Sequence, residues 1–271
     1  MGNLFKYEFR KIYSSKLFYI CLGICVAFIV LNLGLIKLMN LVEPALTEMS
    51  EGQEGAAEVE LAFVSFNYSA IQSLLTGIGN ASITLIGAVF ITLYVSEDYR
   101  NGVIKNIYGK GYSRANVFIA KYVISLASLL VMSIVSMLLS YLLGFLFFGN
   151  EQAAPSNLIY NLLVQLLTVV TYHAVFFAVT MAISKIGIVM VINILGLSLI
   201  TLVVSLASAG LDSVYDLGSF NINDYWFASF LTNLSNINVS TGDITIMLVA
   251  NIIYTGASLA IGYVLTQRKD V

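Results

Sequence analysis

The sequence predicts an all-α, polytopic membrane protein with six transmembrane helices, an N-terminal interfacial helix and both termini in the cytoplasm. Hydrophobic residues make up 59% of the 271 positions and charged residues only 10%, whereas a soluble domain carries about 25% charged residues. Several apolar runs reach the roughly 20 residues that a helix needs to cross a bilayer. The chain has two prolines, and its apolar runs lack the period-two alternation of a β-barrel, so the spans are expected to be helices.

The N-terminal segment 3–16 is expected to form a helix that lies in the membrane interface. Its apolar residues can share one face while its basic residues lie elsewhere: Leu4, Phe5, Phe9, Ile12 and Tyr13 against Lys6, Arg10 and Lys11. The alternative is a simple basic flank of the first span. The six spans are predicted at 17–38, 71–95, 116–148, 158–183, 187–209 and 244–266. The third is longer than a bilayer requires and is expected to tilt or to extend into water.

The charged residues predict the orientation. Every lysine and arginine except Lys37 lies before the first span, between spans two and three or at the start of span three (Lys121), between spans four and five, or after the last span. Most acidic residues lie in the alternate loops, above all in 39–70 and 210–243. The positive-inside rule places the basic side in the cytoplasm. The basic residues serve topology and lipid contact, so no nucleic-acid partner is expected.

Two external segments interrupt this single membrane domain, which covers 1–271. The loop 39–70 is acidic, contains two glycines, and is expected to be partly disordered or to form short helices. The segment 210–243 mixes aromatic residues with Asn, Ser and Asp. That composition suits short helices lying on or dipping into the outer leaflet, and the alternative is an ordinary ordered loop.

Catalytic motifs are scarce. The sequence has no phosphate-binding G-x-x-x-x-G-K-[ST] motif and no H-E-x-x-H motif, so neither ATP hydrolysis by that route nor a metalloprotease centre is expected. The one histidine, His173, lies in the fourth span and is expected to be neutral and hydrogen-bonded between helices, although an ionisable group in a membrane is also a functional candidate. Cys21 and Cys25 lie on one helix face and are expected to be apolar core residues without a disulfide.

Small and neutral polar residues recur along the spans. Thr76, Asn80 and Thr84 are spaced by four on the second span, and they either pack helices together or line a substrate path. Ser136, Ser140 and Gly144 on the third span, and Asn161 and Gln165 on the fourth, form similar ridges. Such ridges let membrane helices approach closely and hydrogen-bond.

The most informative segment is the loop at 97–115 between spans two and three. Its middle can form a short helix with Val103, Ile104, Ile107 and Tyr108 on one face and Lys105 on another. Gly109 and Gly111 are expected to end that helix. A short helix with an exposed apolar face requires a membrane or a protein to cover it.

The run from Glu97 to Lys121 resembles the signature of exporter-type (type-2) ABC transporter permease subunits of the six-span class. The resemblance rests on the acidic pair Glu97-Asp98, the stretch Arg-Asn-Gly-Val-Ile-Lys-Asn-Ile, the pair Ser113-Arg114, and Ala120-Lys121 at the entry to the third span. The basic N-terminal helix, the six spans and the short external helices match along most of the chain. Val103 and the pair Tyr108-Gly109 depart from the residues common in the family.

The resemblance implies a transport subunit that is not itself an enzyme. Two permease subunits, identical or different, would pair in a bacterial cell membrane and dock on separate ABC ATPase subunits that bind ATP and Mg, with no cofactor in this chain. Near 101–109, a coupling helix would contact the ATPase through Val103, Ile104, Ile107 and Tyr108, with charge pairing by Arg100, Lys105 and Arg114, while Glu97 would anchor the loop.

The expected cargo is amphipathic or hydrophobic, such as an antimicrobial peptide or a drug. The alternatives are a membrane scaffold or sensor that transports nothing, a secondary transporter, and an intramembrane enzyme. The last two are disfavoured because the sequence places no Asp, Glu or Arg at mid-membrane depth and no paired catalytic groups there.

Overall fold

The computed structural model describes residues 2–50, 68–79, 81–149, 153–183, 185–214 and 222–268, and these residues form helices and connections without a strand. The helices are α1 (Gly2–Ser14), α2 (Lys16–Ser50), α3 (Ala70–Gly79), α4 (Ala81–Arg100), α5 (Val103–Gly109), α6 (Arg114–Phe148), α7 (Leu158–Ala182), α8 (Ile186–Val191), the π-helix η1 (Ile192–Gly196), α9 (Leu197–Val214), the 3-10 helix η2 (Ile222–Tyr225), α10 (Phe227–Leu234) and α11 (Thr241–Arg268).

Six of these helical segments are long and apolar enough to cross a membrane. They are Lys16–Val42, Ala70–Arg100, Arg114–Phe148, Leu158–Ala182, Ile186–Leu211 and Thr241–Arg268. The predicted all-α, six-span architecture is therefore confirmed. Each boundary lies within a few residues of the predicted one, and the largest differences are in the first two spans, which are longer.

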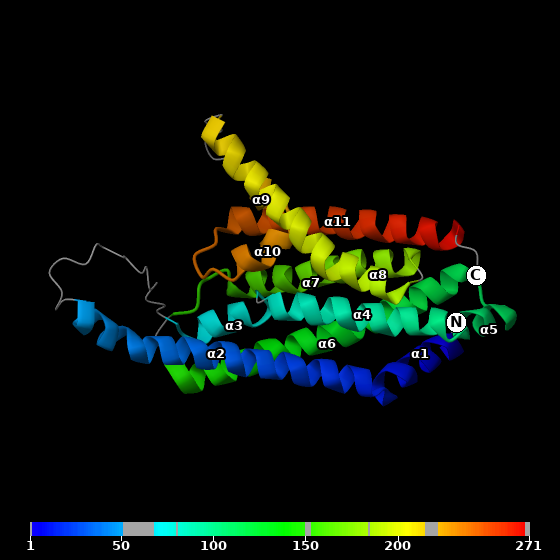
Figure 1. The fold of residues 1–271 in the computed structure, drawn as a ribbon, viewed down its shortest axis with the longest axis horizontal. Helices are drawn as coiled ribbons and strands as arrows, with labels where there is room; N and C mark the ends of the chain where they lie inside the picture. Colours follow the sequence, from blue (N-terminus) through cyan, green and yellow to red (C-terminus); the bar gives the residue numbers. More distant parts are fainter. Residues whose placement is uncertain are drawn as a thin grey trace.

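The six segments form one bundle in which both chain ends lie at the same end (Figure 1). The helices α1 and α5 also lie there, and we call this the basic end because Arg10, Lys105 and Arg268 lie at it. The helices α3 and α10 lie towards the opposite, distal end (Figure 1). The second and fourth segments are the most buried, whereas α9 and α11 expose most of their apolar side chains.

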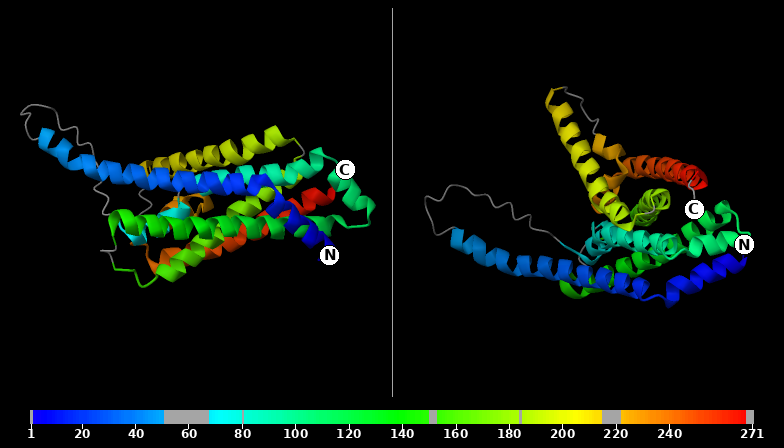
Figure 2. Two further views of the ribbon diagram at one scale, coloured as in Figure 1. Left: turned by 90° about the horizontal axis from the view of Figure 1, so that it is seen from below. Right: turned by 45° about the vertical axis from the view of Figure 1, so that its right-hand side comes forward.

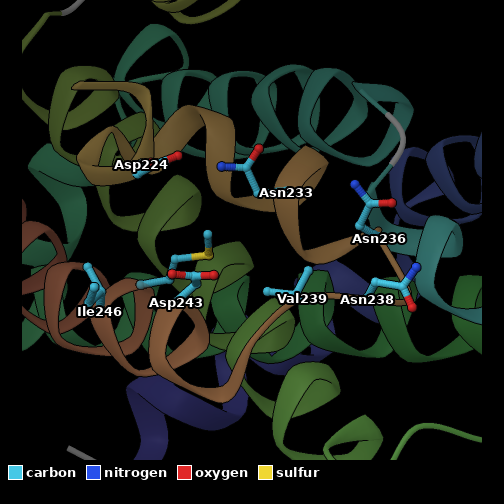
Figure 3. Close-up of a pocket in the computed structure, with 8 residues that line it drawn as sticks. Asp224, Asn233, Asn236, Asn238, Val239, Asp243 and Ile246 are labelled. Atoms are coloured by element: carbon cyan, nitrogen blue, oxygen red, sulfur yellow. The ribbon is translucent and has the colours of Figure 1, made fainter. Parts of the chain in front are cut away.

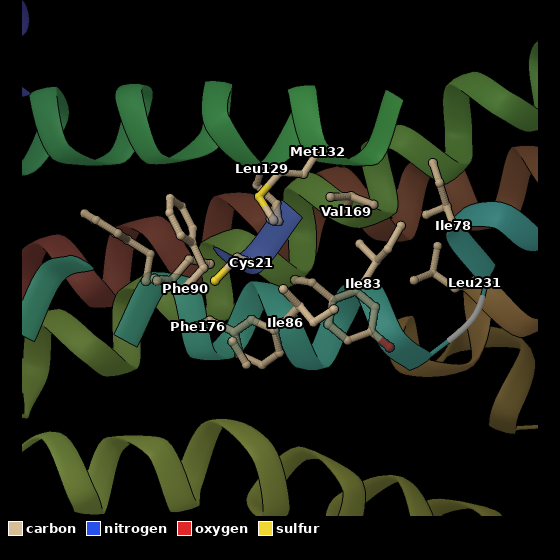
Figure 4. Close-up of a cluster of buried hydrophobic side chains, with 14 of the residues drawn as sticks. Cys21, Ile78, Ile83, Ile86, Phe90, Leu129, Met132, Val169, Phe176 and Leu231 are labelled. Atoms are coloured by element: carbon tan, nitrogen blue, oxygen red, sulfur yellow. The ribbon is translucent and has the colours of Figure 1, made fainter. Parts of the chain in front are cut away.

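The interior of the bundle is packed by aliphatic and aromatic side chains from several helices. Phe90 and Ile86 of α4, Leu129 and Met132 of α6, and Phe176 of α7 are buried in one cluster (Figure 4). Cys21 lies in the same cluster, and both Cys21 and Cys25 are buried free thiols. The prediction that the two cysteines are core residues is confirmed.

Polar side chains of α7 hold two short helices in place. In the second span, α3 ends at Gly79 and α4 begins at Ala81, and residue 80 lies outside the described residues. Gln165 Nε2 donates to the carbonyl oxygens of Leu75 (3.2 Å) in α3 and of Leu234 (2.9 Å) at the end of α10, and Asn161 Nδ2 donates to the same Leu234 oxygen at 3.0 Å. Leu234 is the last residue of α10, so these bonds satisfy a carbonyl oxygen that the helix end leaves free.

The small-residue ridge of α6 packs closely against α3, as predicted. A Cβ atom added at Gly77 would lie 2.8 Å from Ser140 Oγ, closer than such contacts occur in proteins. His173 is fully buried between α6 and α7, and its Nε2 lies 2.8 Å from Ser125 Oγ. The predicted hydrogen bond of this histidine between helices is confirmed.

The structure describes only part of the two segments that were predicted to be external. In the distal segment, η2 and α10 confirm the prediction of short helices, and α10 buries Phe227, Phe230, Leu231 and Leu234. The prediction for 39–70 falls largely on 51–67, outside the described residues, while α2 continues as a helix to Ser50. The helix α9 leaves the bundle at an angle, so that its far end stands away from the other spans (Figure 2).

Candidate functional site

The helix α1 packs against the basic end of the bundle and meets α2 at a bend near Ser15 (Figures 1 and 2). Leu4, Glu8 and Ile12, spaced by four residues, are its buried side chains. Of the predicted apolar face, Leu4 and Ile12 are buried against the bundle, whereas Phe9 is 54% exposed and its ring lies 4.6 Å from that of Tyr13. The centre of the buried face is a carboxylate, which the sequence analysis did not select.

Glu8 belongs to a buried ion cluster that joins three helices. Lys121 Nζ of α6 lies 2.9 Å from Glu8 Oε1 of α1, and it also pairs with Asp98 of α4. Lys11 of α1 pairs with the other oxygen of Asp98, and the Tyr94 hydroxyl donates to Glu8 Oε2. We call these five residues, Glu8, Lys11, Tyr94, Asp98 and Lys121, the ion cluster.

The ion cluster balances two carboxylates against two ammonium groups. Both Lys11 Nζ and Lys121 Nζ also lie over the Tyr94 ring, at 4.7 and 5.2 Å from its centre. Burial lowers the pKa of Lys11, the charge of Lys121 lowers it further, and Asp98 opposes both effects. Buried charges are tolerated when they are paired and hydrogen-bonded, and a partner's removal is costly. The cluster therefore fixes the geometry of α1, α4 and α6 relative to one another.

Two isoleucines of α5 pack it against α1 and the start of α6. Ile104 is 1% exposed and Ile107 8%, and both pack with Leu4 of α1 and with Val117 and Ala120 of α6. The prediction that Ile104 and Ile107 form part of an exposed apolar face is therefore wrong. The physical reason is that α1 and the start of α6 already cover that face.

Glycines delimit α5, and a serine caps the helix that follows it. Gly102 precedes it with φ of +67°, and Gly111 follows its end with φ of +84°, a region that residues with a Cβ rarely occupy. The predicted helix stop at Gly109 and Gly111 is thus confirmed. Ser113 then caps α6 by accepting a hydrogen bond from the Asn116 backbone N–H at 3.3 Å.

The outward side of α5 is polar and basic. Lys105, Asn106 and Lys110 are exposed, and Val103 and Tyr108 are half-buried at its edges. Burial raises the pKa of Tyr108, while Arg114 and Lys121 lower it. A surface of this kind can bind an acidic or polar partner surface by charge pairing.

The structure places the three charged residues predicted for the loop, Arg100, Arg114 and Glu97, in three different environments. Arg100, the last residue of α4, is exposed. Arg114 is half-buried, and its Nη1 donates to the backbone carbonyl of Gln267, so it ties the start of α6 to the end of α11. Glu97 is exposed, whereas the neighbouring Asp98 is 2% exposed and joins the ion cluster. Asp98, not Glu97, anchors the loop.

The polar face of the second span is divided. Thr76 bonds to the Gln72 carbonyl at 2.9 Å and to the Tyr68 hydroxyl at 2.6 Å, both within α3 and the residues just before it. Asn80 lies outside the described residues. Thr84 lines a cavity of 310 Å³ together with residues of α7, η1, α9 and α10.

A second, larger pocket of 480 Å³ opens at the distal end beside α10 and α11 (Figure 3). Its lining includes Asn233, Asn236, Asp224 and Asp243. Burial raises the pKa of Asp224, and the negative charge of Asp243 adds to that effect. Asp243 lies in the first turn of α11: its N–H donates to Ser240 Oγ (3.1 Å), and its carboxylate accepts from the Ser240 hydroxyl (2.7 Å), so the two residues cap the helix. The described residues contain no group of three His, Cys, Asp or Glu side chains able to hold a metal ion.

The sequence analysis did not identify the buried ion pair between Glu8 and Lys121. A signal was present, since Glu8 lies four residues from both Leu4 and Ile12 and therefore shares their face.

No protein-family model matches the chain, and no curated protein matches it.

Proposed function

We propose that this chain is the membrane-spanning permease subunit of an ATP-binding-cassette exporter. It would move an amphipathic or hydrophobic cargo, such as a peptide or a drug, across a bacterial cell membrane. Energy would come from ATP hydrolysed with Mg by a separate ATPase subunit. A second permease subunit, identical or different, would complete the transport unit. By the positive-inside rule, the basic end faces the cytoplasm.

The observation that carries this proposal is the rigid mounting of α5. The helix lies outside the spans, yet Ile104 and Ile107 pack it on α1 and α6. Directly beside this packing, the ion cluster joins α1 and α6 to α4. A force on α5 would reach two spans through packed side chains and buried charges, whereas a flexible loop would absorb it.

The docking surface follows from which side chains of α5 are exposed. Lys105 and Lys110 supply positive charge, with Val103 and Tyr108 at the edges and Arg100 nearby at the end of α4. We therefore expect the ATPase to present an acidic groove. Because Ile104 and Ile107 are buried within the chain, they support this surface from behind.

Co-purification tests the proposal. The chain is expressed with an ATPase that carries a phosphate-binding loop and is encoded beside it, purified by a tag on the chain, and reconstituted into proteoliposomes. We expect the ATPase to be retained, and we expect nisin or ethidium to stimulate ATP hydrolysis and to be transported. Failure to retain the ATPase would contradict the proposal.

The same experiment separates the alternative function. A non-transporting scaffold or sensor would retain the ATPase, but hydrolysis would not respond to any cargo and no probe would cross the membrane. A secondary transporter would move its cargo without ATP, driven by an ion gradient. A secondary transporter would need charges that bind the ion within its spans. The charges of the ion cluster are paired with one another and lie at the basic end.

A further inference from the structure

The outward side of α1 takes no part in the ion cluster or in the packing of α5. The buried residues of α1 are spaced by four and turn towards the bundle. Lys6 and Arg10 are exposed and lie one helical turn apart on the other side. Lys16, the first residue of α2, is exposed as well. Three cations therefore lie where the chain enters the first span.

The charged groups of these three residues have no partner in the described part of the chain. The ion pairs formed there use Lys11 and Lys121 as the cations. The one acidic residue of α1, Glu8, is fully buried and pairs with Lys121. The outward side of α1 therefore carries positive charge that its own helix does not neutralise.

A row of aromatic rings continues from α1 onto α2. The ring centroids of Phe9 and Tyr13 are 4.6 Å apart, and those of Tyr13 and Phe18 are 5.1 Å apart. Phe18 in turn lies 5.4 Å from Tyr19, whose hydroxyl donates to the Tyr13 carbonyl at 3.1 Å. Phe9 and Tyr19 are 54% and 58% exposed. The row therefore presents rings to the surroundings on both helices.

This aromatic row relates α1 to the bilayer. Phe18 and Tyr19 belong to the first turn of the segment Lys16–Val42, which can cross a membrane, so they lie where hydrocarbon meets the headgroups. Aromatic rings are enriched at that depth. The helix α1 bends away from α2 and does not continue along its axis (Figures 1 and 2). The bend keeps α1 near the headgroup layer, which long Lys and Arg side chains can reach.

We propose that the outward side of α1 binds the headgroups of anionic phospholipids. Lys6, Arg10 and Lys16 pair with the lipid phosphates, while the exposed rings of the aromatic row lie against the upper acyl chains. A lipid fits this surface better than an acidic protein, because the rings are continuous with a membrane-crossing helix. Anionic lipids attract Lys and Arg in just this position. The inference requires a membrane but does not rest on the proposed transport function.

Binding at α1 has a consequence for α5. Leu4, on the buried side of α1, packs with Ile104 and Ile107 of α5. A lipid that holds α1 in place therefore also holds the support of α5. We expect anionic lipid to slow amide hydrogen exchange in 2–14, and to a smaller extent in 103–109, relative to a bilayer of neutral lipid.

Two lipids with the same acyl chains test the proposal on the full chain, without any ATPase. Dioleoylphosphatidylglycerol is anionic, and dioleoylphosphatidylcholine has no net charge. The chain is purified in the uncharged detergent dodecyl maltoside, and native mass spectrometry counts the lipids bound at each lipid concentration. We expect phosphatidylglycerol to bind at least tenfold more tightly, because each cation near an anionic lipid is worth about a factor of five. Hydrogen exchange in nanodiscs of each lipid then locates the effect.

Variants assign the preference to α1. The double variant Lys6→Gln, Arg10→Gln should lose the preference for phosphatidylglycerol and the slowed exchange in 2–14. The matched control Lys105→Gln, Lys110→Gln removes the same charge from exposed positions of α5 and should keep both. Phe9→Ala should weaken both lipids and keep the preference, since it removes apolar contact and no charge. Circular dichroism and elution volume establish that each variant is folded.

Four results would overturn the proposal. Equal wild-type affinity for the two lipids would show that charge is not recognised, and a preference that persists in Lys6→Gln, Arg10→Gln would place the site elsewhere. An equal loss in the α5 control would show only general attraction to the basic end, and wild-type binding by Phe9→Ala would remove the rings from the site. All four readouts are independent of ATP and of the ATPase, so the transport proposal is left to its own test.

Discussion

The ammonium group of Lys121 lies 2.9 Å from Oε1 of Glu8, and neither side chain is exposed to solvent. One residue belongs to the third span and the other to a helix that precedes the first span. Asp98 completes the arrangement from the second span. The pair therefore joins α1 to the bundle. The position of α5 depends on both α1 and α6, because it packs against both helices.

Removing one member of the ion cluster should destabilise the protein strongly. Lys121→Met leaves Glu8 and Asp98 with only Lys11 to balance them, so we expect a loss of about 3–5 kcal/mol, measured as thermal unfolding in detergent micelles. The control Lys6→Met, at an exposed position of α1, should change stability by less than about 0.5 kcal/mol.

A charge-balanced double variant tests whether charge or packing causes that loss. Glu8→Gln with Lys121→Met restores neutrality and should recover part of the stability lost in Lys121→Met. If the double variant is less stable than the single one, the ion pair is not the source of the effect.

Asn161 and Gln165 should be cooperative, because both donate to the Leu234 carbonyl. Either Asn161→Leu or Gln165→Leu leaves that oxygen with one donor and should cost about 1 kcal/mol. The double variant leaves it with none, so its loss should exceed the sum of the single losses. Strict additivity in the same unfolding assay would show that the shared carbonyl is unimportant.

Two glycines of α11 should respond to alanine in opposite directions. A Cβ at Gly262 would lie 2.8 Å from Ala178 Cβ, whereas a Cβ at Gly256 would meet nothing within 4 Å. Gly256→Ala should stabilise the helix by about 0.5–1 kcal/mol, and Gly262→Ala should destabilise the bundle by about 1–3 kcal/mol. Equal shifts of the unfolding temperature would contradict the close approach of α11 and α7.

Ile104 should matter for the mounting of α5 and not only for a partner. Ile104→Ala should cost about 2–5 kcal/mol and increase amide hydrogen exchange in 103–109 in the isolated chain. Val103→Ala, at a half-buried position of the same helix, should have a much smaller effect on exchange. Unchanged exchange in Ile104→Ala would show that α1 and α6 do not hold the helix.

Much of the fold could be predicted from the sequence because hydropathy and length decide a membrane span. The six spans, the short helix after Arg100 and its glycine stop all follow from such local patterns. The prediction that Glu97 anchors the loop was wrong by one residue, because sequence does not show which of two adjacent side chains points inward. Helix α4 turns Asp98 towards Lys121 and leaves Glu97 outside.

The candidate site was harder to predict because it depends on packing between distant segments. Ile104 and Ile107 have the pattern of an exposed docking face, and only the position of Leu4 shows that they are covered. The cavity next to Asn193 has no local signal, since it forms where the π-helix meets α4, α7 and α10.

Capture of the ATPase by variants of α5 tests the central proposal most directly. Lys105→Glu reverses an exposed charge on α5, and Lys6→Glu makes the same change at an exposed position of α1 at the same end of the bundle. With equal amounts of folded chain in detergent, we expect Lys105→Glu to retain at least tenfold less ATPase than the wild type and Lys6→Glu to retain it fully. Wild-type capture by Lys105→Glu, or equal loss in both variants, would contradict α5 as the docking helix.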